Sequence, residues 1–291
     1  MSEERRLDER LERRSILGLL VLAPAAGGLL GCTDTGKISA EKAIPQAQFL
    51  LKAANEDLSE LKRGLNKGVP FLVPAFSNGV PDSQTAQKAL ETARNKVQDL
   101  RVAKSTFFAL VDKDGTVIRN DQQQDLMAGK NAFAAFKELK QVFEGKVVES
   151  RGSMKEAAGV RGKPDAQWVL GVPVKVDGKV VAAYVSGWSW SAYAYRLETA
   201  LRSDVLAKTA EGDKVPLLYV YVLVAGQAYG APISPTVNGD AIVKTNPLKG
   251  ASETAPFSVA LEIEGRQFGL AVVPLKAAGP NAGIAVLRSE T

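Results

Sequence analysis

The stretch Phe107–Asn120 combines two apolar runs with a tight turn and predicts a β-hairpin. Its first half, Phe107–Val111, is apolar at every position, and the turn Asp112–Gly115 leads into a β-branched run. A short Asp/Gly turn between apolar runs is a strong hairpin signal. Because successive side chains of a strand point to opposite faces, both faces of the first strand are apolar. We therefore expect its sheet to be covered on both sides.

Further strand patterns predict two small antiparallel sheets. Trp168–Val176 and Lys179–Trp188 flank an Asp-Gly turn and complete the first sheet. A second sheet is predicted from a hairpin and three later strands, which are Leu217–Pro232, Phe257–Ile263, Gln267–Leu275 and Gly283–Arg288.

One short motif occurs in both halves of the chain. Lys-Val-Asp-Gly-Lys at 175–179 is echoed by Glu-Ile-Glu-Gly-Arg at 262–266. This echo indicates a duplicated unit, on condition that the second copy lacks about 25 residues, mostly those equivalent to 131–164.

Apolar residues spaced three and four apart predict two N-terminal helices. The first runs over Ala40–Asn66 with Ser39 as its cap, and the second runs from Ser83 to Lys104. The Pro/Gly-rich segment Val69–Pro81 between them reads as a loop that either packs over the core or contacts a partner or a membrane.

Two more helices and two loops complete the pattern. A helix over Asn131–Phe143 and a linking helix over Ser191–Ala210 carry apolar stripes. Residues 145–164 are polar and rich in glycine and read as a loop over the sheet with a short helical or strand piece. Residues 236–250 read as a loop. The fold class is α+β, with long N-terminal helices followed by two antiparallel sheets and flanking helices.

Composition excludes several classes of function. The 291 residues contain no histidine and one cysteine, so a histidine-based triad, a histidine metal site and an intrachain disulfide cannot form. The net charge is +5, and the basic residues are scattered among acidic ones rather than gathered in one stripe. This distribution argues against a nucleic-acid role. No residue constellation supports an enzyme, a metal or a cofactor.

The single cysteine ends a typical export pattern. Residues 1–14 are dense in charge, an apolar run covers Ile16–Leu30, and Leu29-Leu30-Gly31-Cys32 follows. This sequence resembles the lipobox of bacterial lipoproteins. The resemblance implies that residues 1–31 are a signal peptide and that Cys32 becomes the lipidated first residue, carrying acyl chains such as palmitate. The alternative is a buried free cysteine.

The export route and the final membrane are less defined by the sequence. Arg13-Arg14 resembles a twin-arginine export signal, although Glu12 and Gly18 depart from that pattern, so both this route and the general secretory route stay open. Thr33 after the cysteine implies, by resemblance, the outer membrane facing the periplasm. Residues 32–39 are then a lipidated tether to the bilayer.

The order of elements resembles the Cache family of PAS-like extracytoplasmic sensor domains, in its tandem form. Phe108–Arg119 is similar to that family's first hairpin, Asp125–Lys130 to a stretch before a helix, and Trp168–Tyr184 to its later strands. The resemblance implies N-terminal helices, a first unit, a linking helix and a second, smaller unit. Their bounds are 40–104, 105–190, 191–214 and 215–291.

In that family, the sheet and its covering loops enclose a small ligand. The resemblance therefore implies a pocket for a small carboxylate or an amino acid, lined by polar and aromatic residues of the first unit. The candidates are Arg119, Asp121, Asp125, Arg151, Trp168, Tyr184 and Trp188. An arginine beside aromatic rings can hold a carboxylate through two hydrogen bonds. The alternative is that the aromatic residues are core and the arginines are solvated.

Two readings of function follow. The first is a membrane-anchored, non-enzymatic sensing or binding module, which would report to a separate envelope protein because the sequence shows no transmembrane or output segment. The second is a scaffold lipoprotein of an envelope assembly with a degenerate Cache-like fold. The motif Asp112-x-Asp114-Gly115 is interpreted as a turn, because Leu110 occupies the first ligand position of a calcium loop.

Overall fold

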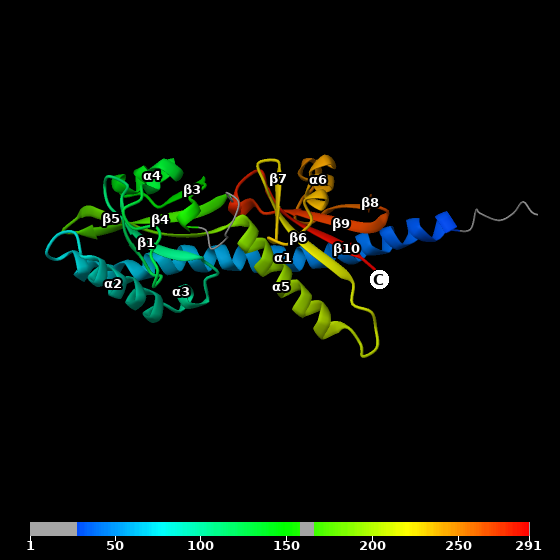
Figure 1. Ribbon diagram of the computed structural model, residues 1–291, viewed down its shortest axis with the longest axis horizontal. Helices are drawn as coiled ribbons and strands as arrows, with labels where there is room; N and C mark the ends of the chain where they lie inside the picture. The colour runs from blue at the N-terminus through cyan, green and yellow to red at the C-terminus, as the bar shows by residue number, and fades with distance from the viewer. Residues whose placement is uncertain (1–27, 158–165, 291) are drawn as a thin grey trace, which may run out of the picture.

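A long helix with two five-stranded sheets side by side along it forms the framework of the computed structural model (Figure 1). The structure describes the backbone of residues 28–157 and 166–290, and side chains from Thr35 onward. The predicted signal peptide lies mostly outside this part of the chain. The backbone of Cys32 belongs to the long helix, but its side chain lies outside the described residues.

The long helix α1 spans Gly28–Leu72 and is longer than the predicted Ala40–Asn66. Residues 32–39, expected to be a tether, are helical. The reason is tertiary, because Ser39 and Ala40 are buried against the second sheet. At its other end the helix continues into the segment predicted as a loop, followed by the 3₁₀ turn η2 (Val73–Phe76), because Leu72 and Phe76 are buried.

The first sheet has the strand order β2-β1-β5-β4-β3. Its strands are β1 (Phe107–Val111), β2 (Val117–Asn120), β3 (Val148–Gly152), β4 (Gln167–Val176) and β5 (Lys179–Ser189). Both predicted hairpins are confirmed, and all pairs are antiparallel. The segment 145–164, predicted as a loop with a short helical or strand piece, contributes the edge strand β3.

Both faces of the first sheet are covered, as the apolar pattern of β1 predicts. Phe108 and Leu110 pack into the core beneath α1, and Phe107, Ala109 and Val111 pack into a separate core on the other face. This second core includes residues of α4 (Ala132–Ala135) and η3 (Lys137–Glu144). The single helix predicted over Asn131–Phe143 is therefore split, with Phe136 non-helical and buried at the break.

The second predicted N-terminal helix is also split. Helix α2 (Ser83–Lys96) begins at the cap Asp82, whose carboxylate accepts hydrogen bonds from the amides of Gln84 and Thr85. Val97 is extended, and the short helix α3 (Gln98–Val102) follows. Val97 and Leu100 are both buried, so the break keeps the apolar side of this segment in the core.

The linking helix α5 (Trp190–Lys208) leads to a second sheet with the order β7-β6-β10-β9-β8. Its strands are β6 (Leu217–Val224), β7 (Gln227–Gly230), β8 (Phe257–Ile263), β9 (Arg266–Pro274) and β10 (Ala282–Ser289). The strand order repeats that of the first sheet. The predicted strands are confirmed, with ends that differ by one or two residues.

The two motif echoes are not equivalent in the structure. The turn at Asp177-Gly178 joins β4 and β5, whereas Glu264-Gly265 joins β8 and β9, which occupy the places of β3 and β4. The second unit also keeps a helix in its connection, α6 (Thr236–Lys244), followed by the turn η5 (Pro247–Lys249). The predicted loop over 236–250 and the proposed loss of the equivalent helix are therefore wrong.

Helix α5 is fastened to the part of β6 that lacks a partner on one side. Strand β7 pairs only with residues 221–224 of β6. Beyond it, the Glu198 carboxylate accepts a hydrogen bond from the Val220 amide at 3.1 Å, and Arg202 donates to the Leu218 carbonyl at 2.7 Å. Side chains thus satisfy backbone groups that a sheet edge would leave open.

Among the described helices, none is long and apolar enough to cross a bilayer.

Candidate functional site

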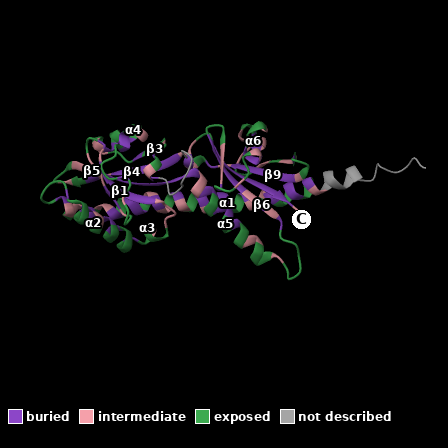
Figure 2. Ribbon diagram, in the orientation of Figure 1, coloured by how far each residue is buried: buried purple, intermediate pink, exposed green. Residues whose placement is uncertain are grey.

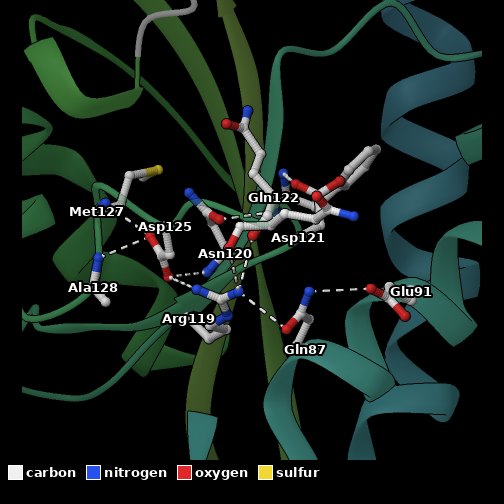
Figure 3. Close-up of polar contacts among 11 residues, drawn as sticks. Gln87, Glu91, Arg119, Asn120, Asp121, Gln122, Asp125, Met127 and Ala128 are labelled. Atoms are coloured by element: carbon white, nitrogen blue, oxygen red, sulfur yellow. Dashed lines mark hydrogen bonds and ion pairs between the residues drawn. The ribbon is translucent and has the colours of Figure 1, made fainter. Parts of the chain in front are cut away.

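Strand β2 ends in a compact polar network centred on Arg119 (Figure 3). The Arg119 guanidinium forms an ion pair with Asp125 at 3.2 Å. It also donates to the Gln87 side chain on α2 at 3.0 Å and to the carbonyls of Gln122 and Gln123. Arg119 is only 8% exposed, so its charge is buried among these acceptors.

Asp125 holds the segment that leaves β2. Its carboxylate accepts hydrogen bonds from the amides of Asn120, Met127 and Ala128 at 2.8, 2.8 and 3.0 Å. An ionised carboxylate with several N–H donors and a cation nearby is well satisfied. Asp125 therefore fixes the turn 120–128 against the sheet.

Asp121 points away from Arg119 and towards α2. Its carboxylate accepts from the Phe108 amide at 2.9 Å and pairs with Arg94 at 2.7 Å. Burial raises the pKa of Asp121, and the Phe108 amide and Arg94 oppose that rise. Arg94 also lies over the Phe108 ring, which contacts Tyr184. Burial, with a smaller effect of the Asp121 charge, raises the pKa of Tyr184.

Trp168 and Trp188 occupy a different place, in the core between the first sheet and α1. Their rings lie 4.9 Å apart, and Trp188 stacks on Tyr193 of α5 at 4.4 Å. The Trp168 indole donates to Glu149, which pairs with Lys62 of α1. The Tyr193 hydroxyl donates to Asp57 of α1 at 3.0 Å.

Arg151 contributes to neither cluster. It lies on β3, and its guanidinium donates to the carbonyl of Ala278 in the second unit. Gly279 follows Ala278 with a positive φ of 124°, and a Cβ there would collide with the Arg151 side chain. Arg151 therefore connects the two units.

The seven predicted site residues thus fall into three groups. Arg119, Asp121 and Asp125 lie together with Tyr184 nearby, Trp168 and Trp188 lie under α1, and Arg151 lies at the contact between units. The partners Gln87, Arg94, Asp57 and Tyr193 were missed. Their only sequence signal is helical spacing, which does not say which element they will meet.

The polar groups of the Arg119 network bond mostly to one another. Among the described side chains, the Arg119 Nε and the Tyr184 hydroxyl are buried atoms without a hydrogen-bond partner. A hollow of about 490 Å³ lies elsewhere, along the α1 side chains between Gln48 and Arg63, and none of the seven residues lines it. The network can order a loop and α2, and its role in ligand binding stays a prediction.

The Asp112 motif forms a turn. Its carboxylate accepts hydrogen bonds from the amides of Asp114 and Thr116 at 2.9 and 2.8 Å, an arrangement typical of Asp in tight turns. Within the described residues, no group of three or more acidic or cysteine side chains is placed to hold a metal ion.

Replacing Arg119 with glutamine is expected to lower the free energy of unfolding by about 2–3 kcal/mol, because hydrogen bonds to a buried charged group contribute about that much. Urea denaturation measures the change. Gln123→Ala, which keeps the backbone acceptor, serves as the control. An R119Q variant as stable as the wild type would show that the guanidinium does not hold the loop and is available to a ligand.

The half-buried Asp57 predicts a pH-dependent effect. Burial raises its pKa above 3.8, opposed by the Tyr193 hydrogen bond and by Lys104. The folded state therefore binds the proton more tightly than the unfolded state, and stability falls as the pH rises from 3.8 through the folded pKa. Asp57→Asn keeps an acceptor for Tyr193 without ionising. It should be more stable than the wild type at pH 7 and lose that advantage as the pH falls towards 3.8.

Denaturation curves at pH 7 and pH 4 test this expectation. Asp57→Ala is the matched variant, since it leaves the buried Tyr193 hydroxyl without its acceptor and should cost about 1–3 kcal/mol. A D57N variant that is less stable than the wild type at pH 7 would mean that the charge of Asp57 stabilises the contact between α1 and α5.

Comparison with known proteins gives structural matches only. No family model matches the chain, and no curated protein matches its sequence. The extracellular domain of vpHK1S-Z8, named as a histidine kinase, has a TM-score of 0.59 at 9% identity, over 88% of this chain and 92% of that one. A sensory box/GGDEF family domain from Vibrio parahaemolyticus has a TM-score of 0.58 at 8% identity, over 88% and 98%.

Two further matches have names that mention ligands. The ligand-binding domain of Mlp24 with asparagine has a TM-score of 0.52 at 14% identity, over 89% of this chain and 95% of that one. An extracellular ligand-binding receptor from Desulfohalobium retbaense has a TM-score of 0.50 at 12% identity, and this chain spans 39% of its length. A long N-terminal helix with two antiparallel five-stranded sheets is the fold of Cache-like, PAS-like extracellular sensor domains, and this chain has that fold.

Proposed function

We propose that this protein is a membrane-anchored extracytoplasmic module that binds a small molecule without transforming it and signals through a separate envelope protein. The observation that carries the proposal is the fold, in which one helix passes under two units of the same strand order. Solved domains with this arrangement are extracellular sensor domains, and one was solved with asparagine. A small carboxylate or an amino acid is the proposed ligand class.

Cys32 is the proposed anchor. Its lipobox-like context supports acylation, which would hold the protein on a membrane, by preference the outer membrane facing the periplasm. Each buried CH₂ of an acyl chain contributes about 0.8 kcal/mol, and stable anchoring takes more than one chain.

Helix α1 provides a physical route from a ligand to a partner. Its residues pack into one continuous core with both sheets, from Ala43 beside the second unit to Leu72 beside the first. A ligand that favours one packing of the first unit on α1 would shift the population of that packing. The end of α1 near Cys32 would then differ between the two states, which a partner could recognise.

A scaffold role is the second candidate, and the Arg119 network favours it. Arg119, Asp121 and Asp125 direct their hydrogen bonds to the protein's own atoms. The outer core of the first unit is filled by apolar residues such as Phe133, Phe136 and Leu139. A degenerate sensor fold that serves only as a structural part of an envelope assembly would have these features.

A thermal-shift screen separates the two candidates. The 33–291 fragment is tested against amino acids and small carboxylates, with the Arg119→Gln variant in parallel. A ligand that binds only the folded state raises the melting temperature, because it adds to the free energy of unfolding. At a ligand concentration of 100 times the Kd, that addition is about 2.7 kcal/mol. A ligand-dependent shift supports the sensor. If no compound shifts the melting temperature and a partner co-purifies in fixed proportion, the scaffold role is supported and the sensor role is rejected.

A further inference from the structure

One end of the second unit gathers three chain segments at the same level. Leu217, the first residue of β6, pairs with Ser289, the last residue of β10. Arg266, which follows the turn between β8 and β9, donates to the Ser289 hydroxyl at 3.0 Å. The loop 209–216 joins α5 to β6 at this same place. We call this surface the basal end, made of residues 206–217, the turn 264–265 and residues 289–290.

Helix α1 begins its packing at the basal end. Gly36 lies against Ala260 and Gln267, with contacts for a Cβ at 3.1 and 3.2 Å. Lys42 forms an ion pair with Glu290 at 3.4 Å. Figure 1 shows the start of α1, the C-terminal end of the chain and the far end of α5 on the same side of the molecule.

The distance from Cys32 to this packed surface is short. Cys32 precedes Gly36 by four residues in the same helix, which is about 6 Å at a rise of about 1.5 Å per residue. Because these residues are helical, the distance between Cys32 and Gly36 is fixed, whereas a flexible tether would let it vary. An acylated Cys32 would therefore place the basal end at the level of the lipid headgroups.

The basal end exposes apolar side chains beside charges of both signs. Leu206 is 62% exposed and Val215 is 45% exposed, on the two arms of the connection between α5 and β6. Figure 2 shows the lower half of α5 and the following loop as largely exposed. Around them stand two basic and two acidic residues, Lys208, Glu211, Asp213 and Lys214. Electrostatic attraction of the basal end to anionic lipid is thus weak. The proposed lipid on Cys32 would be what holds the basal end against the bilayer.

We propose that the basal end rests on the bilayer surface, with Leu206 and Val215 in the headgroup region, so that α1 stands away from the membrane and carries the first unit outward. Apolar residues of surface-bound segments enter this region to a depth of about 5–10 Å. The proposal rests on the proposed acylation of Cys32 and identifies the lipid surface as the partner of this end.

Site-specific quenching tests the proposal in the full, acylated chain. Because Cys32 is the single cysteine and its sulfur would carry the diacylglycerol, a cysteine introduced by Leu206→Cys is the one free thiol. It is labelled with a polarity-sensitive fluorophore and reconstituted into phosphatidylethanolamine/phosphatidylglycerol vesicles that contain nitroxide-labelled lipid. Val80→Cys is the matched control, since Val80 is 68% exposed and follows η2 at the far end of α1.

The expected result is quenching of the Leu206→Cys probe by at least half, with a blue-shifted emission, and no quenching of the Val80→Cys probe. Vesicle flotation is measured on the same samples. Equal, weak quenching at both positions in protein that floats with the vesicles overturns the basal contact and leaves the anchor intact. Protein that does not float overturns the anchor as well, so the two failures are distinguishable.

Discussion

Replacing Gly269 with alanine is expected to lower the free energy of unfolding by roughly 3 kcal/mol, the upper end of the cost of overpacking a core. A Cβ at this position would lie 1.9 Å from the Ala40 nitrogen and 2.2 Å from the Ser39 carbonyl carbon. Both atoms belong to the backbone of α1, so no side chain can rotate away. The helix would have to lift off β9, which exposes Ala43 and Ala47 of the common core.

Gly250→Ala is the matched control for this substitution. No heavy atom lies within 4 Å of a Cβ at Gly250, and its φ of −119° suits any residue. Urea denaturation midpoints of the two variants and the wild type give the comparison. If G269A unfolds at the wild-type midpoint, Ser39 and Ala40 are not packed on the sheet, as expected if residues 32–39 form the tether that the sequence suggests.

Replacing Cys32 with serine is expected to release the protein from membranes almost completely. The hydroxyl cannot form the thioether to the diacylglycerol, and the described helices include none that could span a bilayer. Each acyl CH₂ contributes about 0.8 kcal/mol to partitioning, so losing the chains removes most of the binding energy. Flotation of membranes from cells that express each form measures the change, together with incorporation of labelled palmitate.

Leu206→Ser is the companion variant, because it alters the basal end and keeps Cys32. It should stay with the membrane fraction and keep its palmitate label. If the C32S protein floats as the wild type does, the lipoprotein interpretation is wrong. The proposed contact of the basal end with the bilayer then also loses its support, because it was argued from the short distance between Cys32 and that end. The loss of flotation in L206S alone would instead assign membrane binding to the protein surface.

The strands were the most predictable part of the fold. Runs such as Phe107–Val111 and Phe257–Ile263 are continuous or alternating apolar segments between turn residues, and the structure reproduces their bounds. A strand ends where its turn begins, and Asp and Gly favour that turn through their local conformational preferences. Local chemistry was therefore sufficient.

Helix ends and breaks were less predictable. The start of α1 depends on contact with β9, and the extended Val97 between α2 and α3 depends on burial of Leu100 under Gly64 of α1. Helical periodicity continues through both places, so the pattern alone cannot locate them. Helix α6 was missed because its Gly239 and Asn238 are poor helix formers that become buried against the second unit.

The candidate site shows the same division. The sequence selected Arg119, Asp121 and Asp125, which do lie together, because they follow one another closely at the end of a strand. It also grouped Arg151 with them, although that side chain bonds to a residue 127 positions later. Contacts at such separations depend on how whole elements pack, which no local pattern encodes.

By itself, the sequence excluded histidine-based sites and an intrachain disulfide within these 291 residues, and it located the lipobox-like Cys32 and the strands of two sheets. Composition and local turn preferences are properties of neighbouring residues, and they need no fold to be read. Only the tertiary structure decided that the two sheets share one strand order, that α1 is helical down to residue 28, and that polar candidates satisfy one another. These outcomes depend on burial, which is settled when distant segments pack against each other.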